Sequence, residues 1–358
     1  MSKGKLILFT GFPGILGSHL AKRLLASDPD CRILTLASER SQEYGRREIE
    51  RLEAAHPDFQ GRLTLIQGDL ISPDLGLWRH LEELRPRIEQ IFHLATTYKL
   101  KADPSFTHRI NVVGTRNVVD LARRCPNLTR LQYLSTVHVS GQHKGRFSEE
   151  DFDLKQSFKN AYEESKFQAE REVRESGLPA TIYRAGIMAG DSLSGEIPKY
   201  DGPVGILQLL LQAPALLSKL ATGKAEVNLV PTDYVADAMS YLAARPDSEG
   251  RLFHLSDPDP LTAHQLVEMA RDFLRIRTVE FPLPPRLVAG LLDLRAHHVP
   301  SSISSQAIDY LCQEVKYLAP QTTEALEESG IRCPSLKSYL PTILSYAKKF
   351  HVIQGAIA

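Results

Sequence analysis

The feature that most constrains this chain is a glycine-rich turn between a short apolar run and a helical pattern. Residues 5–9 are apolar apart from the first, glycines follow at Gly11, Gly14 and Gly17, and the helical pattern covers residues 18–26. This order predicts a buried strand, a tight turn and a helix. Gly11 permits a turn that a Cβ would hinder, Gly14 lets the main chain approach a pyrophosphate, and Gly17 allows close packing of helix on strand. The helix N-terminus then offers N–H groups to phosphates.

The glycine spacing is G-x-x-G-x-x-G, whereas the general dinucleotide fingerprint is G-x-G-x-x-G. A glycine-rich turn that binds no ligand is therefore the alternative interpretation of this segment. Further strands are predicted at residues 32–37, 63–66, 90–95 and 131–135, with helical patterns between them, for example at 109–124. Strands that alternate with helices imply right-handed crossovers and a parallel sheet, so the fold class is α/β.

Ligands on such a sheet bind beyond the carboxyl ends of the strands. Several small or polar residues fall at the predicted strand ends: the glycine turn, Asp69, Ala95 to Thr97, and Ser135 with Thr136. This coincidence predicts a ligand site along one edge of the sheet.

Tyr162 and Lys166 are four residues apart in a helical pattern, so their side chains share one helix face. An ammonium near a phenol favours the phenolate and lowers the phenol's pKa. Such a tyrosine can exchange a proton with a substrate oxygen. The alternative is a chance pair on a solvated helix.

As an ordered set, these motifs resemble an extended short-chain dehydrogenase/reductase over roughly residues 5–260. The matching segments are Thr10 to Gly17, Gly68 to Leu70, His93 to Ala95, Asn111 to Thr115, Ser135 with Thr136, and Tyr162 with Lys166. Within that superfamily the chain is similar to the male-sterility branch of fatty acyl-CoA reductases and thioester reductase domains. The segments that suggest this branch are residues 68–70, 73–77, 162–166, 183–187, 190–196, 199–202 and 230–235.

The resemblance implies a Rossmann-type doubly wound parallel sheet with a smaller, mostly helical C-terminal substrate lobe. Residues 1–185 would form the NAD(P)-binding core with the catalytic residues. Residues 186–358 would form mainly the substrate lobe, with 227–257 returning to the core.

The resemblance also implies catalytic roles. Tyr162 would be the general acid in the reducing direction, and Lys166 would bind the nicotinamide ribose and lower the tyrosine's pKa. Thr136 would hydrogen-bond the substrate oxygen, with Ser135 as the neighbouring candidate. Asn111 would orient the active-site helix, or would simply link two helices.

The implied cofactor is NADP, with NAD possible. The residues expected to bind it are Gly11, Phe12, Gly14, Ile15, Leu16, Gly17, Ser38, Arg40, Asp69, Leu70, Ala95, Thr96, Thr97, Ser135, Tyr162 and Lys166.

The chain departs from the family pattern twice. Ser38 stands where the family usually carries the arginine that grips the 2′-phosphate of NADP, and Ala185 stands where a proline is usual. The positive charge would come from Arg40, Arg46 or Arg47. Glu39 would instead favour NAD by accepting from a free ribose hydroxyl.

The expected function is NAD(P)H-dependent reduction of an acyl thioester, carried by coenzyme A or a carrier protein, or of a fatty aldehyde. One alternative is a dehydrogenase or epimerase that acts on a sugar nucleotide or a steroid-like alcohol. Another is an NAD(P)-binding redox sensor, which the joint presence of Thr136, Tyr162 and Lys166 disfavours.

Lysine plus arginine equals aspartate plus glutamate at 43 each, so no net field attracts nucleic acid or an anionic membrane. The four cysteines lack C-x-x-C spacing and fit reduced thiols better than disulfides or a zinc site; no metal site is expected, and the adjacent histidines 297–298 suit a surface loop. The N-terminus leads directly into the first strand, and no apolar run is long enough to span a membrane. We expect a cytoplasmic monomer or homodimer that acts on a small molecule.

The second half contains two apolar segments, residues 206–217 and 281–292. Core packing is the main interpretation of both, and an apolar substrate pocket or a lid that touches the membrane is the alternative. Thr232 or Asp233 is expected to cap a helix. His138 is expected to be packed, and residues 335–350 form a final amphipathic helix.

Overall fold

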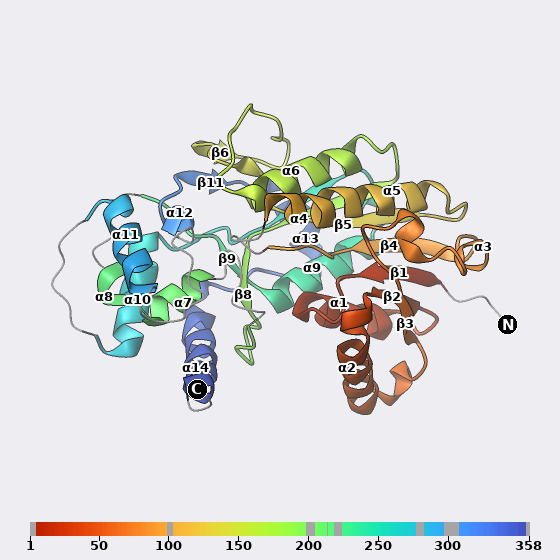
Figure 1. Ribbon diagram of the computed structural model, residues 1–358, viewed down its shortest axis with the longest axis horizontal. Coiled ribbons are helices and arrows are strands. Elements are labelled where there is room, and N and C mark those ends of the chain that lie inside the picture. Colours follow the sequence, from red (N-terminus) through yellow and green to blue (C-terminus); the bar gives the residue numbers. More distant parts are fainter. Residues whose placement is uncertain are drawn as a thin grey trace.

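The computed structural model describes residues 5–98, 103–197, 205–212, 214–217, 224–276, 283–296 and 308–355. The segments 199–202 and 297–298 singled out above lie outside this part of the chain. Figure 1 shows a layered α/β body on the right and a helical lobe on the left, with strands β8 and β9 between them.

The body is built on a parallel sheet of seven strands in the order β10-β7-β5-β4-β1-β2-β3. The strands are β1 (Leu6–Thr10), β2 (Arg32–Ala37), β3 (Leu63–Gln67), β4 (Ile88–His93), β5 (Arg130–Thr136), β7 (Ala180–Ala185) and β10 (Leu252–Leu255). The chain builds outward from β1 in one direction and from β4 in the other. This order confirms the predicted Rossmann-type, doubly wound fold.

Alternate residues of each strand face opposite layers of helices, as the two-residue period of a strand requires. Ile7 and Phe9 of β1 belong to a core beneath α1 (Ile15–Ser27), α2 (Gln42–Ala55), α9 (Thr232–Ala244) and α13 (Pro320–Leu326). Leu6 and Leu8 belong to a core beneath α3 (Leu81–Leu84), α5 (Gly114–Arg123) and α6 (Ala161–Arg174). The sheet is therefore buried on both faces, which explains why its strands are almost continuously apolar.

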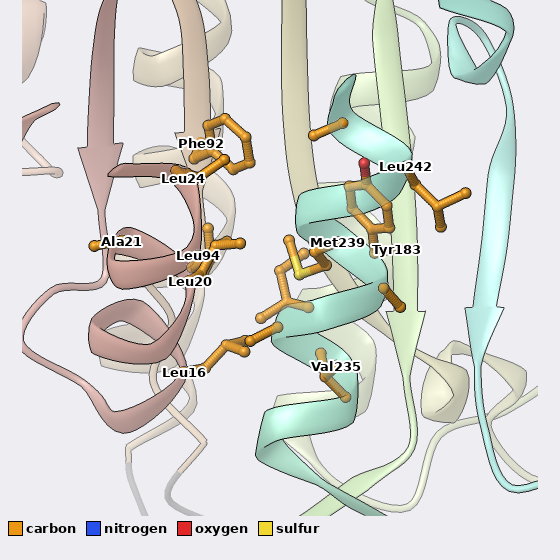
Figure 2. Close-up of a cluster of buried hydrophobic side chains, with 14 of the residues drawn as sticks. Leu16, Leu20, Ala21, Leu24, Phe92, Leu94, Tyr183, Val235, Met239 and Leu242 are labelled. Carbon is orange, nitrogen blue, oxygen red and sulfur yellow. The ribbon is translucent and has the colours of Figure 1, made fainter. Parts of the chain in front are cut away.

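Figure 2 shows the first of these cores, in which α1 and α9 lie side by side on the sheet. Leu16 of α1 points toward Val235 and Met239 of α9, whereas Leu20 and Leu24 lie beside Leu94 and Phe92. All of these side chains are buried. The apolar faces of the two helices thus hold α1 against the sheet, with its first turn beside the glycine turn.

The helical lobe has its own apolar core. Its helices are α7 (Gly205–Gln212), α8 (Pro214–Leu217), α10 (Ala263–Leu274), α11 (Pro285–Ala296), α12 (Ile308–Leu311) and α14 (Leu336–Gly355). The short parallel pair β8 (Ile187–Gly190) and β9 (Leu229–Pro231) joins the lobe to the body, and β6 (Gly145–Phe147) pairs with β11 (Val315–Tyr317).

The apolar segments of the lobe differ in burial. Leu207 and Leu210 of α7 are fully buried, which supports core packing for residues 206–217. The second segment is not buried all round, because Leu287 and Leu291 of α11 are 50% and 40% exposed. Within the described residues, no helix combines the length and apolarity needed to cross a membrane.

Element boundaries agree with the sequence expectations to within a few residues, with one interruption. β2 has the predicted bounds, whereas β4 begins and ends two residues before its prediction. The helix predicted over 109–124 is divided, because Arg109–Val113 form a π-helical turn between α4 (Pro104–His108) and α5. Such turns insert one extra residue and often lie at functional sites.

Candidate active site

The glycine turn is held together by close main-chain approaches. Gly11 has φ +97°, and a Cβ there would lie 2.9 Å from the Cβ of Leu94 and 3.0 Å from the amide nitrogen of Ala95. Cβ atoms at Gly14 and Gly17 would lie 2.8 and 2.7 Å from the Gly11 carbonyl oxygen. These contacts are closer than any real Cβ makes, so the turn requires glycine at all three positions.

Helix α1 begins directly behind this turn. Its N-cap residue is Gly14, which is exposed and offers no side-chain hydrogen bond to the first helical amides. Phe12 and Leu16 point into the core under the sheet, so they face a ligand only with their main chain, while Ile15 is half-buried. An uncapped helix N-terminus with an exposed glycine suits a phosphate anion.

The turn lies between β1 and its neighbour β4, where the order in which the chain adds strands to the sheet reverses. Ala95, Thr96 and Thr97 follow β4 and are half-buried beside the turn. Asp69 and Leu70 follow β3; the Asp69 carboxylate is exposed and accepts from the Ile71 amide and the Ser72 hydroxyl. The structure therefore brings these residues to the edge where a parallel sheet of this order binds ligands.

Ser38 and Arg40 follow β2 at the same edge and are both exposed. The Ser38 hydroxyl lies 3.0 Å from that of Ser41. Of the nearby arginines, Arg47 forms an ion pair with Glu43, whereas no ion pair to Arg40 is found within the described residues. Arg40 thus presents a charge to solvent at the end of β2.

Tyr162 and Thr136 meet at the carboxyl end of β5. The hydroxyl of Tyr162, in the first turn of α6, is hydrogen-bonded to the Thr136 hydroxyl, and both side chains are more than 90% buried. The Thr136 hydroxyl also donates to the Ala185 carbonyl at 3.3 Å and accepts from the His138 amide. Asn160 caps α6 through the Glu163 amide and so fixes where the helix begins relative to β5.

Lys166 is one turn further along α6 and is buried. Its ammonium donates to the Tyr133 hydroxyl at 2.9 Å and to the Leu134 carbonyl at 2.7 Å. Burial lowers the pKa of Lys166 to about 7, and the nearby Glu170 carboxylate raises it. This ammonium has three N–H donors and, among the residues that the structure describes, two hydrogen-bond partners, which leaves one donor for a ligand.

The expected depression of the Tyr162 pKa is reversed in the structure. Burial raises the pKa of Tyr162 well above its ordinary value, and the hydrogen bond with Thr136 lowers it only in part. The physical reason is that the site is dry and Lys166 donates to Tyr133 and Leu134. Tyr162 is therefore a phenol that keeps its proton at neutral pH.

Ser135 and Thr136 point in different directions. The Ser135 hydroxyl donates to Glu170 at 2.6 Å, inside a buried network in which Glu170 also binds Arg184 and Arg174. The expectation that Ser135 is an alternative to Thr136 at the substrate oxygen is therefore not supported, because its hydroxyl is held by Glu170.

Asn111 lies in the π-helical turn and is 1% exposed. Its amide nitrogen donates to the Thr97 carbonyl and to the Ser165 hydroxyl, both at 2.9 Å. Its amide oxygen accepts from the Thr96 hydroxyl and the Thr97 amide. Asn111 thus ties the loop after β4 to helix α6, as expected for a residue that orients the active-site helix.

Several residues near the site were not singled out in the sequence. Tyr98 follows the loop after β4 and lies close enough to Tyr162 to influence it electrostatically. Lys159, before α6, forms a buried ion pair with Glu163 at 2.9 Å and lies 4.4 Å from the ring centre of Tyr310 in α12. Nothing in the sequence pointed to Tyr98 or Tyr310, because each comes from a segment distant from α6 along the chain.

Three other expectations concern the surroundings. Thr232 and Asp233 do not cap α9, because the N-cap is Pro231; the Asp233 carboxylate instead accepts from the amide and hydroxyl of Ser192. His138 is packed as expected, with the ring of Tyr310 4.8 Å away. All four cysteines are free, as expected.

A family model matches most of the chain. The family model described as male sterility protein matches residues 9–239. Glycine betaine reductase ATRR of Emericella nidulans is 28% identical over 304 residues, which cover 80% of this chain and 23% of that protein. Adenylate-forming reductase Nps11 of Serpula lacrymans var. lacrymans is 30% identical over 284 residues, 75% of this chain and 25% of that protein. The chain thus spans about a quarter of the length of these relatives.

Among solved structures, the terminal R domain from the myxalamid PKS-NRPS biosynthetic pathway is similar over nearly the whole fold. Its TM-score is 0.80 at 27% sequence identity, covering 97% of this chain and 91% of that one.

Proposed function

Because the chain belongs to the male sterility family of extended short-chain dehydrogenase/reductases, we propose that it reduces an acyl thioester, or the aldehyde that this thioester yields, with NAD(P)H. One observation carries the proposal. The hydroxyls of Thr136 and Tyr162 meet one helical turn from the buried ammonium of Lys166, on the sheet edge that also holds the glycine turn. A carbonyl oxygen that enters this site would accept from both hydroxyls once Thr136 turns its proton away from the Ala185 carbonyl and Tyr162 turns its own away from Thr136.

The residues at the sheet edge fit a nicotinamide dinucleotide. Gly14 and the uncapped start of α1 provide main-chain donors for the pyrophosphate. Asp69 and Leu70 would flank the adenine, and Ala95 to Thr97 would line the cofactor. The third N–H of Lys166 would bind the nicotinamide ribose.

We propose NADP as the preferred form. Arg40 is exposed at the end of β2, where a guanidinium would hold the 2′-phosphate, and Ser38 would add a hydroxyl donor. In the alternative, the cofactor is NAD and Glu39 accepts from its free ribose hydroxyl. The ratio of NADPH to NADH affinity decides between them.

When bound, the cofactor supplies the hydride that reduces the carbonyl carbon. Thr136 and Tyr162 stabilise the negative charge that develops on the substrate oxygen, and their burial strengthens these hydrogen bonds. Tyr162 then transfers its proton to that oxygen. With an aldehyde this gives the alcohol; with a thioester it gives a hemithioacetal, whose hydroxyl proton passes to sulfur as the carbon–sulfur bond breaks, so that the thiol and the aldehyde are released. Because burial raises the pKa of Tyr162, its hydroxyl is protonated at neutral pH and has a proton to give.

The relatives support a thioester substrate. Two of them are reductases by name, and the solved structure described above is a terminal R domain from a PKS-NRPS biosynthetic pathway. We propose a thioester on coenzyme A or on a carrier protein. A dehydrogenase or epimerase of sugar nucleotides or steroid-like alcohols keeps the same catalytic residues and is the second candidate.

The four free cysteines support a reducing compartment such as the cytoplasm. We propose that the protein is a monomer or a homodimer there. Light scattering on the purified protein distinguishes these two states.

The test is oxidation of NADPH and NADH with panels of acyl-CoA, fatty aldehyde, steroid and nucleotide-sugar substrates. We expect turnover with acyl-CoA or aldehyde, and loss of that turnover in Tyr162→Phe with cofactor binding retained. Tyr183→Phe is the matched control, because it removes another buried tyrosine hydroxyl that is bonded to Gln132 instead. Near-normal activity of Tyr162→Phe would overturn the assigned role. If no substrate in these panels supports oxidation of NADPH or NADH, the redox-sensor alternative is favoured.

A further inference from the structure

The ammonium of Lys166 is held by a tyrosine that is itself part of a longer chain of hydrogen bonds. Tyr133 on β5 is 1% exposed; its hydroxyl lies 2.9 Å from the Lys166 nitrogen, and its ring centre lies 4.5 Å from that nitrogen. An ammonium can only donate, so the Tyr133 oxygen accepts from Lys166 and must direct its own proton elsewhere.

The proton of Tyr133 goes to Thr115 on α5, to which the phenol is hydrogen-bonded. The Thr115 hydroxyl in turn donates to the Asn111 carbonyl at 2.6 Å. Its remaining lone pair faces Nε2 of His93, 3.0 Å away. Thr115 therefore uses its one proton and both lone pairs, which leaves a single consistent arrangement of protons.

His93 fits this arrangement as a neutral ring. Burial and, to a lesser extent, the Lys166 charge together lower its pKa to about 3. Its Nε2 then carries the proton donated to Thr115, and its Nδ1 accepts from the Thr10 hydroxyl at 2.8 Å. Thr10 also accepts from the amides of Leu94 and Ala95, beside the glycine turn.

The chain closes on the active-site helix through Asn111. Its side chain donates to Ser165, and the Ser165 hydroxyl donates to the Tyr162 carbonyl at 2.8 Å. The path from Lys166 ends on the Asn111 main-chain carbonyl, which cannot pass a proton on. The network therefore fixes positions and does not conduct protons.

We propose that Tyr133 and Thr115 are positioning residues that hold the Lys166 ammonium in place and in its charged form for the cofactor. This inference rests on the proposed function for the role of Lys166, while the network itself is independent of it. It also explains why His93 and Thr115 belong to the matching motifs although neither reaches the substrate hydroxyls.

Other titratable side chains near Lys166 include Glu170 and His93. Glu170, one turn along α6, favours the ammonium, but its charge is shared with Arg184 of β7 and with Arg174. On the opposite side, His93 is neutral. Tyr133 is thus the one side chain found within the described residues to hydrogen-bond the ammonium directly.

Removing the Tyr133 hydroxyl leaves the buried ammonium with one acceptor fewer. We expect Tyr133→Phe to move the titration of Lys166 to lower pH by about one pH unit. If the charged form binds the cofactor, the Kd for NADP⁺ rises about tenfold near pH 8 and less than about twofold near pH 5.5.

The experiment is calorimetric titration of NADP⁺ into the full chain at a series of pH values, for wild type and variants. The ionisation of NADP⁺ cancels in the ratio of variant to wild type. Thr115→Val should give the same pH-dependent loss to a smaller extent, and Thr115→Ser should restore wild-type behaviour. Tyr183→Phe is the control for loss of a buried tyrosine hydroxyl and should give a ratio that does not change with pH.

A pH-independent ratio for Tyr133→Phe would overturn the inference and show a structural role only. If wild type binds neither NADP⁺ nor NAD⁺, the proposed function fails, and the unfolding free energy of the free protein tests the network. Since the pKa of Lys166 is lowered by folding, stability falls as pH falls toward about 7 and then levels off. Tyr133→Phe should continue to lose stability below that pH, and a profile parallel to Tyr183→Phe would contradict the inference.

Discussion

The buried ion pair behind the active site gives the sharpest stability prediction. Glu170 and Arg184 have fully buried side chains, and the carboxylate lies 2.7 Å from the guanidinium. Glu170 also accepts from Arg174 at 2.9 Å and from Ser135 at 2.6 Å. The perturbation is Glu170→Gln, which keeps the shape of the side chain but removes its charge.

The cost follows from the pKa of Glu170. Burial alone would raise this pKa, but Arg184, Arg174 and the Ser135 hydroxyl outweigh it and lower the pKa to about 2. Relative to the ordinary value of 4.5, this difference corresponds to about 3 kcal/mol of stability at neutral pH. Because the folded pKa is the lower one, this stability is present above pH 4.5 and is lost as pH falls toward about 2. Removing one partner of a buried pair costs roughly 3–5 kcal/mol in other proteins, which agrees.

Urea unfolding at neutral pH measures the effect. We expect Glu170→Gln to lose about 3 kcal/mol. Glu172→Gln on the same helix is the matched control; it breaks a partly exposed pair with Arg116 and should cost less than about 1 kcal/mol. The double change Glu170→Leu with Arg184→Met should recover part of the loss, because no charge is left buried. If Glu170→Gln costs no more than Glu172→Gln, the reasoning about burial is refuted.

Three further predictions concern the site. Gly17→Ala places a Cβ 2.7 Å from the Gly11 carbonyl and should cost about 1–3 kcal/mol in urea unfolding while weakening NADP⁺ binding; unchanged binding would contradict the role of the turn. Arg40→Ala should weaken NADPH roughly tenfold to a hundredfold and leave NADH unchanged in fluorescence titrations; equal losses would show that Arg40 does not contact the 2′-phosphate. Asn111→Ala should cost roughly 1–3 kcal/mol for each buried group left unpaired, with a fall in kcat larger than the rise in KM; a stable, fully active variant would refute its positioning role.

The sequence was sufficient to predict the parts of the fold that depend on local order. The alternation of apolar strands and helices predicted the parallel sheet, and the glycines located its turn to within a residue of where β1 ends. Helical spacing predicted that Tyr162 and Lys166 share one face of a helix, whereas their catalytic roles came from the family resemblance. These features are local, so a chain met for the first time reveals them.

The partners of these residues depend on contacts between distant segments. Two-residue alternation places Tyr133 and Ser135 on the face of β5 that is covered by α6, which explains why Ser135 binds Glu170. Thr136 is the last residue of β5, and the chain leaves the sheet there, so its side chain lies toward Tyr162. The pKa of Tyr162 was expected in the wrong direction because spacing reports proximity along a helix and says nothing of burial. No local signal in the sequence distinguished the π-helical turn at Asn111 from an ordinary helix.

The central claim is that three side chains converge beside a nicotinamide bound at the glycine turn. A crystal structure of the full chain with NADP⁺ tests it most directly. The account predicts the pyrophosphate at the start of α1, a ribose hydroxyl on Lys166, and the ring beside the hydroxyls of Tyr162 and Thr136. A dinucleotide bound elsewhere, or a nicotinamide ring out of reach of Tyr162, would contradict it.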